Sequence, residues 1–154
     1  DDDIAIIMLS NKSHPNFDHI SFEIAKIIAN KDYSPEMPIV DNEVNRKFTY
    51  KILKALESKG SEAAADIYKR KKSTENILEF IMRNEGFNKI DNKFNDLALK
   101  IFRFNVDVHP YSAKALQGLG EGYMETGNKE LAIQFFEKSL KIDSENTFVI
   151  NMLK

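Results

Sequence analysis

Two histidines near the N-terminus have the side-chain types and spacing of a metal site. His19 and Glu23 are four residues apart, so a helix would place them on one face, and His14 and Asp18 lie close by. The alternative is a solvent-exposed helix start, where acidic side chains are favoured near the positive end of the helix dipole. We favour this alternative, and the sequence predicts neither a metal nor another cofactor.

The basic run Lys69-Arg70-Lys71-Lys72 has the charge to contact phosphate groups. It lies in the last turn of a predicted helix, where positive charge is favoured in any case, and no aromatic side chain interrupts it. The chain carries 22 Lys and Arg against 24 Asp and Glu, a formal charge of −2, so no strong field attracts polyanions. We therefore expect no nucleic-acid partner.

His109 stands directly before Pro110, where a predicted helix ends. A cation at this position would suit the negative end of the helix dipole. We expect this structural role and no catalytic one.

Three glycines, Gly118, Gly120 and Gly122, resemble a phosphate-binding loop in spacing. Such a loop needs a preceding strand and a turn that opens a helix, whereas these glycines lie inside a helical pattern. Each glycine in a helix costs about 1 kcal/mol relative to alanine. We therefore expect Gly118 and Gly122 to admit a neighbouring helix or a ligand backbone, and Gly120 to allow close packing.

The elements that position these residues are mainly amphipathic helices. The chain has 154 residues, no Cys and no apolar run near the length of a membrane span, so we predict no disulfide and no membrane-spanning helix. Residues 4–9 have the apolar pattern of a buried strand, and residues 15–30 that of a helix. Helices are then predicted at 42–58, 62–72, 75–91, 94–108, 113–125, 129–142 and 146–153. Their short connections require antiparallel neighbours.

Small and bulky residues recur every 34 positions, which is the period of the tetratricopeptide repeat (TPR), one helix–turn–helix per unit. Three sets of positions share this period: Ala64, Ala98 and Ala132; Tyr68, Phe102 and Phe136; and Gly86 and Gly120. Tyr123 stands at the Tyr position of the repeat. Unit 113–146 resembles the TPR best, units 79–112 and 45–78 are degenerate, and residues 147–154 are expected to form a capping helix. The predicted fold is all-α, with TPR-like hairpins stacked in a short superhelix.

A larger resemblance covers most of the chain. The segments that carry it are Phe102-Arg103-Phe104-Asn105-Val106-Asp107, Pro110-Tyr111-Ser112, Leu119-Gly120-Glu121-Gly122-Tyr123 and Gly127-Asn128-Lys129-Glu130-Leu131-Ala132-Ile133. They resemble the C-terminal TPR tail of bacterial serine hydrolases, either β-lactamase/penicillin-binding-protein-like enzymes or certain α/β-fold esterases. The N-terminal segment is similar to the last strand and helix of the β-lactamase-like domain. The resemblance implies a truncated catalytic domain at 1–36, a linker at 37–41 and a helical-repeat domain at 42–154.

The catalytic residues of that enzyme class are absent from this chain. The reaction needs a nucleophilic Ser one helical turn before a Lys, and no Ser has a Lys three residues later. Tyr-x-Asn and Lys-Thr-Gly are also absent. The sequence therefore predicts that this chain is no enzyme, although the resemblance implies a serine-hydrolase parent and an extracytoplasmic location, periplasmic or secreted.

A helical repeat usually binds an extended peptide on the first helix of each unit. The register places six side chains there: Arg83, Phe87, Lys114, Gln117, Glu121 and Met124. Phe80 and Ile90 share this face, and the set of Phe80, Arg83, Phe87 and Ile90 is apolar enough to pack against another helix or domain instead. Glu121 and Phe87 depart from the Asn and Lys of the TPR carboxylate clamp, so a C-terminal carboxylate is not the expected ligand.

Two functions remain open from the sequence. The chain is either a non-catalytic interaction or docking module at the C-terminus of a serine hydrolase, or a free-standing TPR adaptor that binds a peptide. The expected partner is a protein, a peptide or the missing catalytic domain. Residues 1–11, whose strand is cut from its sheet, are expected to be disordered, folded back or paired with a second copy in a homodimer through residues 4–9.

Overall fold

The structure, a computed structural model, describes residues 39–154, which contain seven helices and no strand. The helices are α2 (Glu43–Lys59), α3 (Ser61–Lys71), α4 (Glu79–Asp91), α5 (Asn95–Val108), α6 (Ala113–Glu125), α7 (Lys129–Ile142) and α8 (Thr147–Met152). The predicted strand at 4–9, the helix at 15–30, the truncated domain at 1–36, the homodimer contact and the His14–His19–Glu23 group lie outside the described residues.

Four helices begin at a polar side chain that caps them. Asn42, Ser112, Asn128 and Asn146 each accept a hydrogen bond from the backbone N–H three residues later. These bonds satisfy N–H groups that have no partner within the helix. Local sequence therefore fixes where these helices start.

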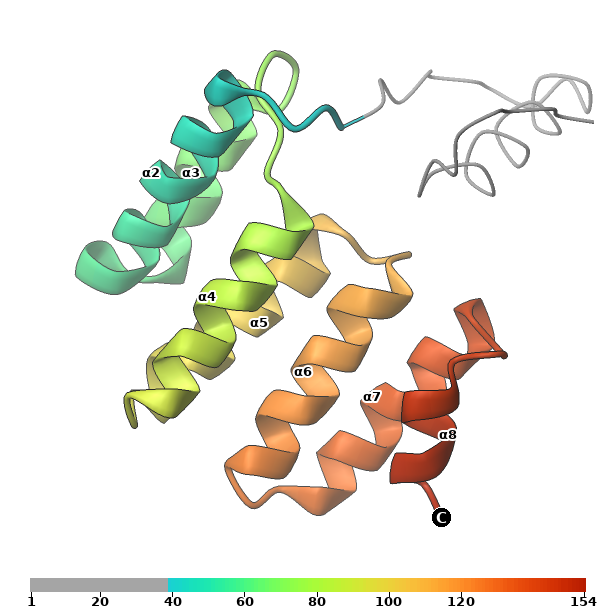
Figure 1. The fold of residues 1–154 in the computed structure, drawn as a ribbon. Coiled ribbons are helices and arrows are strands. Elements are labelled where there is room, and N and C mark those ends of the chain that lie inside the picture. The colour runs from blue at the N-terminus through green and yellow to red at the C-terminus, as the bar shows by residue number, and fades with distance from the viewer. Residues whose placement is uncertain (1–38) are drawn as a thin grey trace, which may run out of the picture. The chain divides into compact units, whose positions relative to one another are not determined.

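The helices form antiparallel hairpins that stack side by side. α2 pairs with α3, α4 with α5, and α6 with α7, while α8 packs on α7. Figure 1 shows α4 and α6 side by side with α5 behind α4, and contacts between α5 and α6 join the two hairpins. Glycines with positive φ, Gly60 at 86° and Gly127 at 85°, form the turns in the first and third hairpins. The all-α, TPR-like stack predicted from the sequence is thus confirmed.

The repeat positions lie in the core between these helices. Ala64, Ala98, Ala132, Phe102 and Phe136 are all 0% exposed. Tyr123 is also buried, and Tyr68 is partly buried against the core. The 34-residue spacing therefore reports the helix surfaces that face one another inside the stack.

Glycines and phenylalanines interlock within this core. A Cβ atom on Gly86 would lie 2.5 Å from the Phe102 ring, and one on Gly122 would lie 2.7 Å from it. Phe102 of α5 is therefore held between α4 and α6. Gly120 makes the same kind of contact with Phe136 of α7, at 2.7 Å. No side chain larger than hydrogen fits at these three glycines without movement of a ring.

The predicted helix at 75–91 begins later than expected, at Glu79. The Asn76 N–H donates to Asn45 Oδ1 at 2.8 Å, and the Leu78 N–H donates to Thr49 Oγ1 at 2.9 Å. Side chains of α2 thereby satisfy the backbone donors that would otherwise favour a helix. Residues 75–78 are therefore not helical, and the prediction of a helix start at residue 75 is wrong.

Candidate peptide-binding face

The six predicted peptide-binding residues lie on two neighbouring helices. Arg83 and Phe87 belong to α4, whereas Lys114, Gln117, Glu121 and Met124 belong to α6. The two helices are in direct contact, and all six side chains except the exposed Lys114 are half-buried. We call the surface formed by α2, α4 and α6 the first-helix face, because each helix is the first of its hairpin.

A row of polar side chains crosses this face. Asn146 Nδ2, at the start of α8, donates to Gln117 Oε1 at 2.9 Å, and Gln117 Nε2 donates to Glu121 Oε1 at 2.8 Å. The positive charge of Arg83, on α4, acts on both Glu121 and Glu79. We call these five residues the polar row.

Two members of the polar row were not predicted. Glu79 lies four residues before Arg83 on α4, so helical spacing is a signal that would have placed the two on one face. Asn146 is visible in the sequence only as a helix cap. Its bond to Gln117 spans 29 positions and depends on how α8 packs, which no local pattern reveals.

The interactions of the Glu79 carboxyl group only partly offset the cost of its burial. Loss of solvent raises the pKa of Glu79, and the positive charges of Arg83 and Lys114 and the Ser112 hydroxyl offset only part of this effect. Its Oε1 atom is buried without a hydrogen-bond partner, as is Nε of Arg83. The two side chains therefore keep hydrogen-bonding capacity that the described part of the chain does not use.

Burial also raises the pKa of Glu121. The Gln117 hydrogen bond and the Arg83 charge lower it, whereas Glu125 raises it further. The polar row thus holds two carboxyl groups and one guanidinium in partial burial, where an added partner group interacts more strongly than on an open surface.

Two glycines of α6 leave space for side chains of the neighbouring helices. A Cβ on Gly118 would lie 3.1 Å from Arg83 Cγ, so the missing side chain makes room for the Arg83 stem. Gly122 makes room for Phe102 in the same way. The sequence left open whether these glycines admit a helix or a ligand, and in the structure side chains of α4 and α5 lie against them.

The apolar residues of the predicted set contribute more to packing than to an open surface. The Phe87 ring contacts the buried Phe102 ring edge-on, with centroids 5.1 Å apart, and Met124 packs on the same core cluster. Ile90 is only 8% exposed and belongs to the core cluster, which agrees with the alternative that it packs against another helix. Phe80 remains exposed, and the Arg46 guanidinium lies 6.0 Å from its ring centroid.

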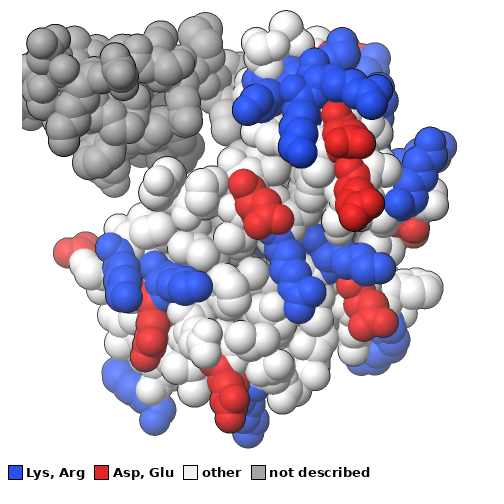
Figure 2. Space-filling view, turned by 180° about the vertical axis from the view of Figure 1, so that it is seen from behind, with Lys and Arg blue, Asp and Glu red and all other residues white. Residues whose placement is uncertain are grey.

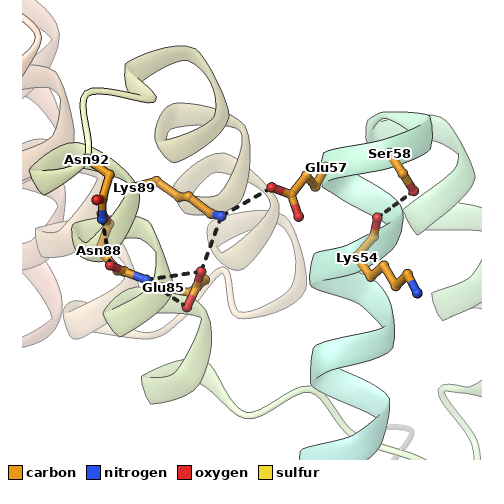
Figure 3. Close-up of polar contacts among 7 residues, drawn as sticks. All are labelled: Lys54, Glu57, Ser58, Glu85, Asn88, Lys89 and Asn92. Carbon is orange, nitrogen blue, oxygen red and sulfur yellow. Dashed lines mark hydrogen bonds and ion pairs between the residues drawn. The ribbon is translucent and has the colours of Figure 1, made fainter.

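A second feature lies between α2 and α4. Lys89 Nζ is 3.2 Å from Glu57 Oε1 across the helices and 3.6 Å from Glu85 on its own helix (Figure 3). Beside this bridge is an open cavity of about 330 Å³, whose apolar wall includes Leu53 and Ile101. Lys89 stands where the repeat expects Tyr, and in this structure it forms an ion pair with the first hairpin.

His109 is not the cation that the sequence suggested. Burial lowers its pKa to about 4, and a backbone hydrogen bond with Ile77 offsets this only in part. The imidazole is therefore neutral near pH 7, and Nε2 is buried without a partner. The helix-dipole interpretation is wrong because burial penalises the charged form more than the dipole favours it.

The described helices carry neither a cluster of metal ligands nor a membrane span. Among residues 39–154, no three His, Asp or Glu side chains come together to hold a metal ion. Within the same part of the chain, no helix combines the length and the apolar character needed to cross a bilayer.

Comparison with known proteins agrees with the hairpin geometry. Residues 113–146 match the tetratricopeptide repeat. The chain is also similar to a protein of Arabidopsis thaliana named Protein CTR9 homolog, at 27% identity over 99 residues. That match covers 61% of this chain and 9% of the relative, so the chain spans less than a tenth of the relative's length. No solved structure matches the chain.

Proposed function

We propose that this chain is a non-catalytic protein-interaction module that holds an extended partner segment on its first-helix face. The TPR match at 113–146 and the stacked hairpins support an interaction role. The observation that carries the proposal is the polar row. Its charged members Glu79 and Arg83 are partly buried, and each keeps a buried polar atom without a hydrogen-bond partner, so their burial is incompletely compensated by the described residues.

Arg83 is the residue on which we expect binding to depend most. It contacts both hairpins, since its stem lies against Gly118 and its charge acts on Glu79 and Glu121. Arginine is enriched among residues that dominate interface energies, because its planar head forms several directed hydrogen bonds. A partner carbonyl or carboxylate oxygen would accept hydrogen bonds from the Arg83 guanidinium, and its buried Nε–H would take part only if the side chain shifts on binding.

The test is selection of binding peptides from a displayed random library with the wild-type chain, followed by affinity measurement. We expect Arg83→Ala to weaken the selected peptides by about tenfold or more, and Gln134→Ala, an exposed change on α7, to leave them unaffected. Circular dichroism checks that both variants fold. Failure to enrich any peptide, or equal affinity for wild type and Arg83→Ala, would refute the proposal.

We propose further that residues 42–154 fold as one domain. The described residues form a single compact unit, Ile39–Lys154, and their buried apolar side chains gather in two core clusters. Deletion of residues 1–36 should therefore leave the helical part folded, with the same cooperative thermal transition. Loss of that transition on deletion would place the boundary elsewhere.

The origin of the module is a separate proposal with two forms. In the first, it is the C-terminal tail of a β-lactamase-like serine hydrolase and docks onto that enzyme's catalytic domain; in the second, it is a free-standing adaptor. The first form, with its extracytoplasmic location, rests on the sequence resemblance described above, and the similarity to the CTR9 homolog adds nothing to it. Reading the coding sequence upstream of Asp1 decides between them. An in-frame Ser-x-x-Lys and Tyr-x-Asn support the enzyme parent, and a reading frame without them supports the adaptor.

A further inference from the structure

Positive charge is concentrated in the first hairpin. Residues 43–72 hold nine Lys and Arg against four Asp and Glu, whereas residues 79–154 hold ten against eleven. The net charge near zero of the whole chain therefore conceals a basic first hairpin. Such a local field attracts an oppositely charged partner even when the protein as a whole does not.

The end of α3 carries the densest part of this charge. All four basic side chains are exposed: Lys69, Arg70, Lys71 and Lys72. Of these four, only Lys71 has an ion-pair partner among the described residues, Glu75 at 3.4 Å. Figure 2 shows a gathering of Lys and Arg on one end of the molecule as seen from behind. We call Lys69, Arg70 and Lys72 the α3 cations.

The helix dipole does not account for this density. A helix C-terminus carries about half an elementary negative charge, which one or two cations already balance. Further like charges within one turn repel one another. An acidic ligand would relieve this repulsion, so the surface has a charge that favours binding beyond what its own helix requires.

We propose that the exposed end of α3 is a second binding surface, which takes an acidic peptide segment through Lys69, Arg70 and Lys72. A single-stranded nucleic acid fits less well, because such surfaces combine charge with aromatic platforms for bases. The one aromatic residue adjoining the run, Tyr68, packs edge-on against Phe104, with ring centroids 6.5 Å apart. The turn at 73–76 contains no aromatic residue.

This surface is distinct from the first-helix face. It lies on α3, the second helix of its hairpin, and includes no member of the polar row. The two proposals therefore fail independently.

The test measures binding of a fluorescent poly-glutamate peptide by anisotropy at low and high salt. The variant K69Q/R70Q/K72Q removes three positive charges from the end of α3. The matched control K100Q/K129Q/K141Q removes three exposed charges from α5 and α7. Loss of about tenfold in affinity is expected for the first variant only, together with a steep decrease on addition of salt.

The proposal would be overturned by the absence of saturable binding by the wild type, by equal losses in the two triple variants, or by tighter binding of oligothymidylate than of the peptide. If Arg83→Ala abolishes peptide binding while the α3 variant retains it, the acidic segment binds the first-helix face instead.

Discussion

Substitution by alanine at Gly118 or at Gly122 of α6 separates two contributions to stability that oppose each other. Either change removes the flexibility of glycine inside a helix and gains about 1 kcal/mol. At Gly122 the new Cβ would lie 2.7 Å from the Phe102 ring, which is fully buried and faces Gly86 on its other side. The ring has no free space into which to move, and overpacking of this kind costs about 1–3 kcal/mol.

At Gly118 the new Cβ would lie 3.1 Å from Cγ of Arg83, a flexible stem that can shift. We therefore expect Gly122→Ala to lower the free energy of unfolding by up to about 2 kcal/mol. Gly118→Ala should leave it unchanged or raise it by up to about 1 kcal/mol. Urea denaturation followed by circular dichroism measures both.

A double-mutant cycle identifies the cause. In a Phe102→Leu background the ring that the new methyl group would meet is gone, so Gly122→Ala should no longer destabilise the protein. If Gly122→Ala stabilises the wild-type chain as much as Gly118→Ala does, the interlock of Phe102 between α4 and α6 is not as described.

Buried and bridging polar groups give three more predictions. His109 has a pKa of about 4 in the folded chain against an ordinary value of 6.5, so the unfolded chain binds more protons between these values. Neutral His109 therefore contributes about 3 kcal/mol to the free energy of unfolding above pH 6.5, and this contribution is lost as the pH falls to 4. The His109→Gln variant should not show this loss. Glu79 and Glu121 of the polar row have the opposite pH dependence, but they are present in both the wild type and the His109→Gln variant. The difference between the stability–pH curves of these two proteins therefore isolates His109. Parallel curves would contradict the burial argument. Thr49→Val leaves the buried Leu78 N–H without an acceptor and should cost about 1–3 kcal/mol in chemical denaturation, whereas a cost near zero would mean that this bond is not formed. The Lys89–Glu57 ion pair, with Glu57 exposed, should show a coupling of no more than about 1 kcal/mol in a double-mutant cycle, and a clearly larger value would mean that the pair is shielded from water.

The sequence predicted those parts of the fold that depend on local signals. Residues 113–125 and 129–142 are helical as expected, since Ser112 and Asn128 cap them and Gly127 turns the chain between them. The 34-residue period also marked the buried side chains, because repeat units bury equivalent positions. The start of α4 was missed, since it depends on hydrogen bonds from α2 across about thirty positions.

The candidate site was less accessible to prediction from sequence. Helical register placed Arg83, Gln117 and Glu121 on adjoining helices, but it gave no information on burial. Register therefore did not show that Ile90 lies in the core, or that His109 is buried and for that reason neutral. The polar row is complete only when α4, α6 and the start of α8 come together.

Nuclear magnetic resonance titration of the isotopically labelled chain with a selected peptide tests the central proposal most directly. Binding on the first-helix face predicts that the side-chain signals of Arg83 and Gln117 shift in proportion to bound peptide, while those of exposed α7 residues such as Gln134 remain unchanged. Shifts confined to α5 and α7, with the Arg83 and Gln117 signals unmoved at saturation, would contradict it.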